Sequence, residues 1–168
     1  RQAIDYELFM GEKKTEAMLY FASLVKKATN NRLFVGTYAG YLLNVINYDM
    51  AASTSQTSFQ KILESDSIDF ITCPWNYGER EIGYSGDYMS AVDSVTAHGK
   101  LYIAEDDNRN HTTTMFEAPD ARASVGWTRT AEQSIEQLKR NFAYALSKGC
   151  GLYLYSLAGT YFTDKQLW

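Results

Sequence analysis

Residues 99–109 read GKLYIAEDDNR, and this stretch decides the fold prediction. Its first half is a near-continuous apolar run, which is typical of a buried strand. The run leads directly into Glu105, Asp106 and Asp107, with Arg109 close behind. In parallel α/β folds the loops at the carboxyl ends of the strands build the functional site. The stretch therefore predicts a buried strand with a charged rim at its carboxyl end.

The same alternation of helix and strand recurs along the chain. Strands are predicted at 32–38, 68–73, 100–104 and 151–157, and helices over 12–30, 57–64, 88–98 and 130–149. This order favours a parallel sheet in one α/β domain spanning residues 1–168. An open doubly wound sheet and part of a (β/α)₈ barrel both fit the order. No strand leads into a GxGxxG or GxxxxGK[ST] turn, and every strand ends in polar or aromatic residues, which favours the barrel.

The helix predicted after Thr130 has the clearest pattern. Thr130 and Gln133 resemble a capping box, and Gly149 ends the helix. Its apolar residues share one face, which we expect to pack on the core: Ile135, Leu138, Phe142, Ala145 and Leu146.

Composition excludes several classes of function. The 168 residues carry a net charge of −4, and their Lys and Arg residues are scattered, so we expect no nucleic-acid partner. No apolar run approaches the roughly 20 residues needed to span a bilayer, so no membrane association is expected, and the compartment stays open. Cys73 and Cys150 lie outside any metal-binding spacing and are expected to be buried thiols. His98 and His111 are separated by a strand, so neither a metal site nor a Ser-His-Asp site is predicted. No cofactor is predicted either.

Glu105 is the candidate catalytic residue. In retaining glycoside hydrolysis one carboxylate attacks the sugar while a second, roughly 5 Å away, acts as acid and then as base. A simple ion pair between Glu105 and Arg109 at a strand end is the alternative. Aromatic side chains that follow the strands are candidates to stack on sugar rings: Tyr38, Tyr41, Trp75, Tyr77 and Tyr155. For Tyr153, core packing is an equal alternative.

Four segments resemble the second half of beta-galactosidase-like glycoside hydrolases. They are residues 17–41, residues 64–74, residues 92–95 and residues 98–109, and the resemblance covers almost the whole chain. It implies that the four strands correspond to strands 5 to 8 of a TIM barrel, with Glu105 as the nucleophile and Asp107 and Arg109 beside it. It also implies an acid/base glutamate before Arg1, for which Glu7 is a poor substitute.

The resemblance implies a carbohydrate ligand and a partner that completes the barrel, either a missing N-terminal half or a second copy. Near the last strand the chain departs from the family pattern, since Tyr155, Ser156 and Leu157 stand where Trp and an acidic residue are common. Two other hypotheses stay open. One is a non-catalytic carbohydrate-binding or assembly module with barrel geometry, and the other is an open α/β sheet that binds another small molecule.

Overall fold

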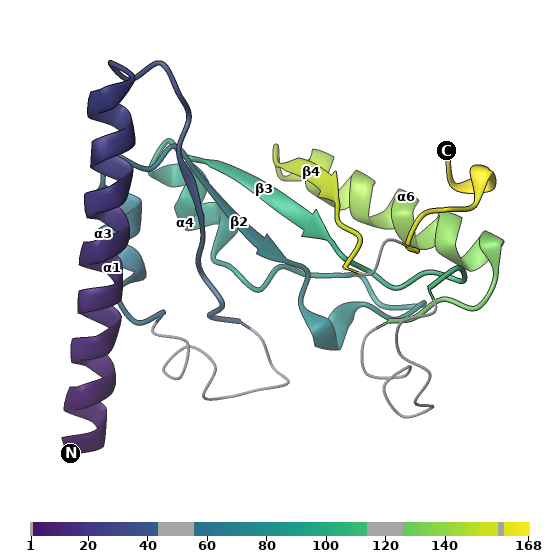
Figure 1. Ribbon diagram of the computed structural model, residues 1–168. Helices are drawn as coiled ribbons and strands as arrows, with labels where there is room; N and C mark the ends of the chain where they lie inside the picture. Colours follow the sequence, from purple (N-terminus) through teal and green to yellow (C-terminus); the bar gives the residue numbers. More distant parts are fainter. Residues whose placement is uncertain (1, 44–55, 114–125, 158–159) are drawn as a thin grey trace. The chain divides into compact units, whose positions relative to one another are not determined.

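The computed structural model describes residues 2–43, 56–113, 126–157 and 160–168 (Figure 1). Four strands form one all-parallel sheet in the order β1-β2-β3-β4, so the predicted parallel α/β fold is confirmed. The chain groups into two compact units. Of the described residues, unit 1 comprises 2–43, 56–73 and 89–103, and unit 2 comprises 74–88, 104–113, 126–157 and 160–168. That the whole chain is a single domain stays a prediction.

The elements follow the predicted order. Unit 1 holds α1 (Gln2–Ala28), β1 (Gly36–Tyr38), α3 (Phe59–Glu64), most of β2 (Phe70–Pro74) and α4 (Val92–Ala97), while β3 (Leu101–Asp106) begins in unit 1 and ends in unit 2. Unit 2 holds η1 (Tyr77–Glu79), α6 (Ala131–Ser147), β4 (Gly151–Leu154) and η2 (Lys165–Leu167).

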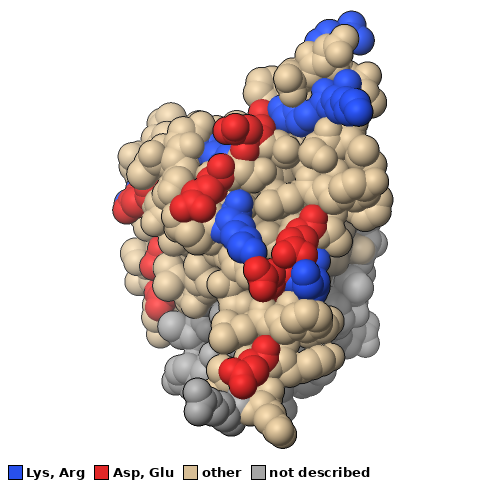
Figure 2. All heavy atoms as spheres, turned by 90° about the vertical axis from the view of Figure 1, so that its left-hand side faces the viewer, with Lys and Arg blue, Asp and Glu red and all other residues tan. Residues whose placement is uncertain are grey.

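In unit 1, α1 contacts α3, and β1 pairs with β2 in parallel (Figure 1). Gly36 lies opposite Phe70, and a Cβ at Gly36 would lie 2.1 Å from the Phe70 ring, so a side chain at this position would displace that ring. Asp69 fixes the start of the pair, because its carboxylate accepts hydrogen bonds from Lys26 Nζ at 2.7 Å and from Val35 N at 2.6 Å. Figure 2 shows acidic and basic side chains interspersed over the face on which α1 lies.

In unit 2, α6 contacts both β4 and η2. Thr130 caps α6 as predicted, because its side chain accepts a hydrogen bond from Gln133 N. Trp75 is 1% exposed and stacks on Tyr88 with ring centroids 4.6 Å apart, and Tyr144 of α6 lies against both rings. These three rings thus pack together in the interior of this unit.

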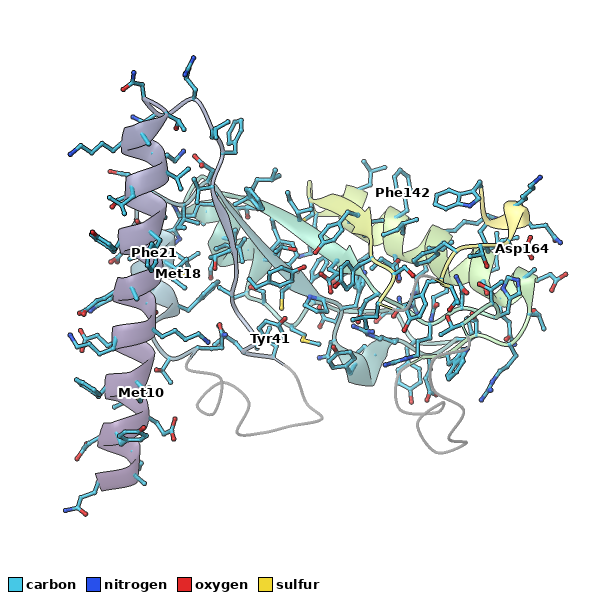
Figure 3. The ribbon with its side chains drawn as sticks, in the orientation of Figure 1. Met10, Met18, Phe21, Tyr41, Phe142 and Asp164 are labelled. Atoms are coloured by element: carbon cyan, nitrogen blue, oxygen red, sulfur yellow. The ribbon has the colours of Figure 1, made fainter. Side chains whose placement is uncertain are left out.

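Three local predictions were wrong. The first helix starts at Gln2, ten residues before the predicted start, because residues 2–11 contain no proline and only one glycine, so nothing in them interrupts the helix. α6 buries only part of its predicted apolar face: Ala145 is 1% exposed, but Phe142 is 59% exposed and Leu146 67%, and Phe142 points outward (Figure 3). Cys73 is buried as predicted, but Cys150 is only partly buried.

Candidate functional site

Glu105 lies at the carboxyl end of β3, inside the strand rather than after it. Its side chain is 5% exposed and accepts a hydrogen bond from the Tyr153 hydroxyl on β4. A phenol that donates to a carboxylate fixes the direction in which the carboxylate oxygens point. Tyr153, for which the sequence left core packing open, therefore belongs to the site through its hydroxyl.

A buried ion pair lies two residues further along the chain. Arg80 is fully buried, and its Nη2 lies 2.6 Å from Asp107 Oδ1. The guanidinium also donates to Trp75 O from Nε at 3.2 Å and from Nη2 at 2.8 Å, and its carbon lies 4.0 Å from the centroid of the Tyr77 ring. These contacts hold the Arg80 side chain in one position. They also offset part of the cost of burying its charge.

Asp106 points away from Glu105 and Asp107, because successive side chains of a strand lie on opposite faces. It is fully buried against α6, where Asn141 Nδ2 donates to Asp106 Oδ2 at 2.8 Å, and Asn108 N donates to Asp106 Oδ1 at 3.2 Å. Burial raises the pKa of Asp106 more than these hydrogen bonds and the nearby Arg80 lower it. Asp106 thus ties the end of β3 to α6.

The buried face of α6 is polar and holds the other side of the site. Gln137 Nε2 donates to Arg80 O at 2.8 Å and to Gly126 O at 2.8 Å. Arg140 Nη2 also donates to Arg80 O, at 3.1 Å. These contacts explain why α6 turns polar side chains toward the interior. Buried carbonyl and carboxylate groups need hydrogen-bond donors, which an apolar face cannot supply.

Two further tyrosines, Tyr77 and Tyr161, and Arg109 interact electrostatically with the charged groups of this site. Burial raises the pKa of Tyr77, and the charge of Asp107 adds to the effect, while Arg80 and Arg109 oppose it. Burial likewise raises the pKa of Tyr161 against the opposing charge of Arg109. Within the described residues, Arg80 Nη1 and both polar side-chain atoms of Asn108 are buried without a hydrogen-bond partner. Such atoms are usually satisfied by water or by a ligand.

A second polar cluster in unit 2 joins a serine, a histidine and an aspartate. His111 Nε2 lies 2.9 Å from Asp164 Oδ2, and His111 Nδ1 lies 2.8 Å from Ser134 Oγ. Ser134 is 1% exposed, and its hydroxyl lies 2.9 Å from Thr130 O. A hydroxyl that is buried and bonded to its own helix cannot attack a substrate, so this cluster fastens the segment around Asp164 to α6.

The predicted site residues fall into three groups. Glu105, Asp107 and Arg109, at or just after the carboxyl end of β3, all act electrostatically on Tyr77. Tyr155 follows β4, is 40% exposed, and its N–H donates to Asp106 O.

The other aromatic candidates lie elsewhere. Tyr38 and Tyr41 belong to unit 1, where Tyr38 is 49% exposed and Tyr41 half-buried. Trp75 belongs to unit 2, but its ring is packed in the core and presents no open face. Stacking of any of these rings on a sugar stays a prediction.

We did not select Arg80, Asn141 or Gln137 from the sequence. Arg80 stands in a loop rich in glycine and charge, and the two amides stand on the polar face of a helix whose apolar face was expected to be inside. A sequence signal does exist for Gln137 and Asn141, because they lie four residues apart and share a face with Ser134 and Ala145.

Among the described residues, no group of three or more His, Cys, Asp or Glu side chains is arranged to hold a metal ion. Within the same residues, no helix combines the length and apolar character that a membrane crossing needs. No protein-family model, curated protein or solved structure matches the chain.

Proposed function

We propose that this chain is half of a (β/α)₈ barrel of a retaining glycoside hydrolase, with Glu105 as the nucleophile. The observation that carries the proposal is the setting of Glu105: a carboxylate at the carboxyl end of a parallel strand, oriented by Tyr153 and followed by the Arg80–Asp107 pair. Catalytic groups of barrel enzymes occupy this position. The resemblance of residues 98–109 to beta-galactosidase-like enzymes supports the same assignment.

In this mechanism a Glu105 oxygen attacks the anomeric carbon, and the bond from that carbon to the leaving oxygen breaks. Tyr153 holds the attacking carboxylate in one orientation. Arg80 neutralises Asp107, which limits the negative charge beside Glu105. The protonating acid comes from residues before Arg1 or from a second chain, because Asp106 is turned toward α6 and Asp107 is committed to Arg80.

The order of elements supports completion of the barrel by further strands. α3, α4 and α6 each connect two strands that are neighbours in the sheet. α1 precedes β1 in the same way, so a right-handed crossover would bring a preceding strand to the outer edge of β1. Beside β1, unit 1 carries an open apolar groove of about 300 Å³ lined by Met18, Phe21, Ala22, Val25, Val35, Gly36 and Ile68. The Met18 and Phe21 side chains extend from α1 (Figure 3).

The substrate is a carbohydrate in this proposal. Tyr77, Arg109 and Tyr155 of unit 2 contact it. The buried polar atoms of Arg80 and Asn108 suit a ligand rich in hydroxyl groups, because a hydroxyl both donates and accepts hydrogen bonds.

The test is the hydrolysis of 2,4-dinitrophenyl β-glycosides by the full natural chain. Glu105→Gln removes the nucleophile and preserves the shape of the side chain, so kcat is expected to fall on the order of 10³-fold or more. Glu81→Gln, which changes an exposed glutamate of unit 2, serves as the matched control and is expected to keep full activity. Proton NMR of the first-formed sugar is expected to show the retained anomer. Undiminished hydrolysis by Glu105→Gln, or an inverted product, contradicts the proposal.

A non-catalytic carbohydrate-binding module is the second candidate. It is favoured by the commitment of Asp106 and Asp107 to other partners, which leaves Glu105 without a paired acid from its own strand. Sugar binding by the full natural chain without any turnover selects this candidate.

A further inference from the structure

We propose that Gln137 and Asn141 of α6 are positioning residues for the acidic rim of β3. This inference rests on the proposed function, since the rim is taken as the hydrolytic site. The two amides hold the groups on either side of Glu105.

Asn141 holds the carboxyl end of β3. Its Nδ2 donates to Asp106 Oδ2, and both side chains are fully buried. Asp106 stands between Glu105 and Asp107 in the chain, so a fixed Asp106 fixes the backbone from which both neighbours project. Asn108 N adds a second hydrogen bond to the same carboxyl group. The end of β3 therefore has one register against α6.

Gln137 holds Arg80, the residue whose guanidinium pairs with Asp107. It lies one helical turn before Asn141 and donates to the carbonyl of Arg80, whose guanidinium pairs with Asp107. Gln137 also donates to Gly126 O, which holds Gly126 against Arg80. Gly126 has a φ of +64°, and a Cβ there would lie 2.6 Å from the Arg80 carbonyl carbon, so the approach is as close as glycine allows.

Hydrogen bonds from α6 thus hold the backbone of Arg80 and the residue next to Asp107, and so position both members of the Arg80–Asp107 pair. A buried ion pair stabilises a fold little, but it can specify one arrangement when its geometry is fixed. In a displacement reaction, small errors in the placement of catalytic groups cost large factors in rate. The polar inner face of α6 supplies this placement, which explains why α6 buries Gln137 and Asn141 and exposes Phe142 and Leu146.

The test compares Gln137→Met and Asn141→Leu with Glu136→Leu, an exposed control on the same helix. The first readout is the Arg80 Nε–H signal in ¹H–¹⁵N NMR spectra of the folded full chain. We expect its exchange with solvent to accelerate by about tenfold or more in the two variants and not in the control. The second readout is hydrolysis, for which we expect kcat to fall on the order of tenfold to a hundredfold while KM stays unchanged.

Rescue separates positioning from a loss of stability. The double variant Asp106→Asn with Asn141→Asp reverses donor and acceptor and restores the hydrogen bond, so it is expected to recover most of the kcat that Asn141→Leu loses. Unchanged Arg80 exchange together with unchanged kcat in the folded variants overturns the inference, as does a loss of kcat that the reversed pair fails to recover. If the unsubstituted full chain hydrolyses no glycoside, the proposed function fails, and the Arg80 signal alone decides whether α6 positions the rim.

Discussion

At the residue scale, the site depends on carboxyl groups whose surroundings differ sharply along a few positions. Glu105 receives a hydroxyl, Asp106 an amide and Asp107 a guanidinium. The strand period of two sends the middle acid to the helix and its neighbours to the other face. The sequence predicted Glu105 at a rim because the apolar run ends there. It could not predict these three partners, since each lies at least 25 residues away in the chain and is brought close only by the fold.

Asp69 permits a residue-scale prediction about pH. Burial alone would raise the pKa of Asp69, but hydrogen bonds from Lys26 and Val35 N outweigh it and hold the pKa below the usual aspartate value. An acid whose folded-state pKa is depressed stabilises the fold above its unfolded-state pKa of about 3.9, and this contribution is lost as the pH falls through the folded-state pKa.

Asp69→Asn is therefore expected to lower the free energy of unfolding by about 1 kcal/mol at pH 7. The difference from the unsubstituted protein should shrink toward zero as the pH falls through the depressed folded-state pKa of Asp69. Urea denaturation across this range measures both values, with Asp66→Asn, which alters a nearby exposed aspartate, as the control. A difference that is independent of pH would show that the charge of Asp69 is not what matters.

At the element scale, local signals predicted the order of helices and strands because apolar periodicity, caps and turn residues are properties of neighbouring residues. Thr130 and Gln133 marked the start of α6 correctly, since a cap depends only on neighbouring residues. The direction in which α6 faces depends on what lies beneath it. Its apolar stripe indicated one face, but the buried carbonyl of Arg80 and the carboxyl group of Asp106 require donors, and so the polar face is buried.

The cap of α6 gives an element-scale prediction. Thr130→Ala removes the acceptor for Gln133 N and is expected to lower the free energy of unfolding by about 1 kcal/mol. Thr130→Ser keeps the hydroxyl and should retain nearly all of the stability. Thermal denaturation followed by circular dichroism compares the two variants, and equal losses from both would mean that the hydroxyl of Thr130 does not cap the helix.

At the scale of the whole molecule, alternation of helices and strands was sufficient to predict a parallel sheet, and the sheet is confirmed. Closure of that sheet into a barrel depends on strand stagger and on strands outside this chain, which no local pattern encodes. The barrel and its hydrolytic activity are therefore proposals that rest on the position of Glu105 at the end of β3 and on the crossover implied by α1. The proposed barrel and the proposed hydrolysis both give Glu105 the role of nucleophile.

Covalent trapping tests that role most directly. The full natural chain is incubated with 2,4-dinitrophenyl 2-deoxy-2-fluoro-β-glycosides of the gluco and galacto series. A Glu105 oxygen forms a bond to the anomeric carbon while dinitrophenolate leaves with the electron pair of the broken bond. This leaving group needs no proton, so the step does not require the acid partner.

Peptide mass spectrometry then locates the adduct. We predict a mass increase of one fluorosugar on Glu105, accompanied by one equivalent of released dinitrophenolate, and neither event in Glu105→Gln. Attachment to another carboxylate, or an unmodified Glu105 in a protein that hydrolyses the parent glycoside, contradicts the assignment of Glu105 as the nucleophile.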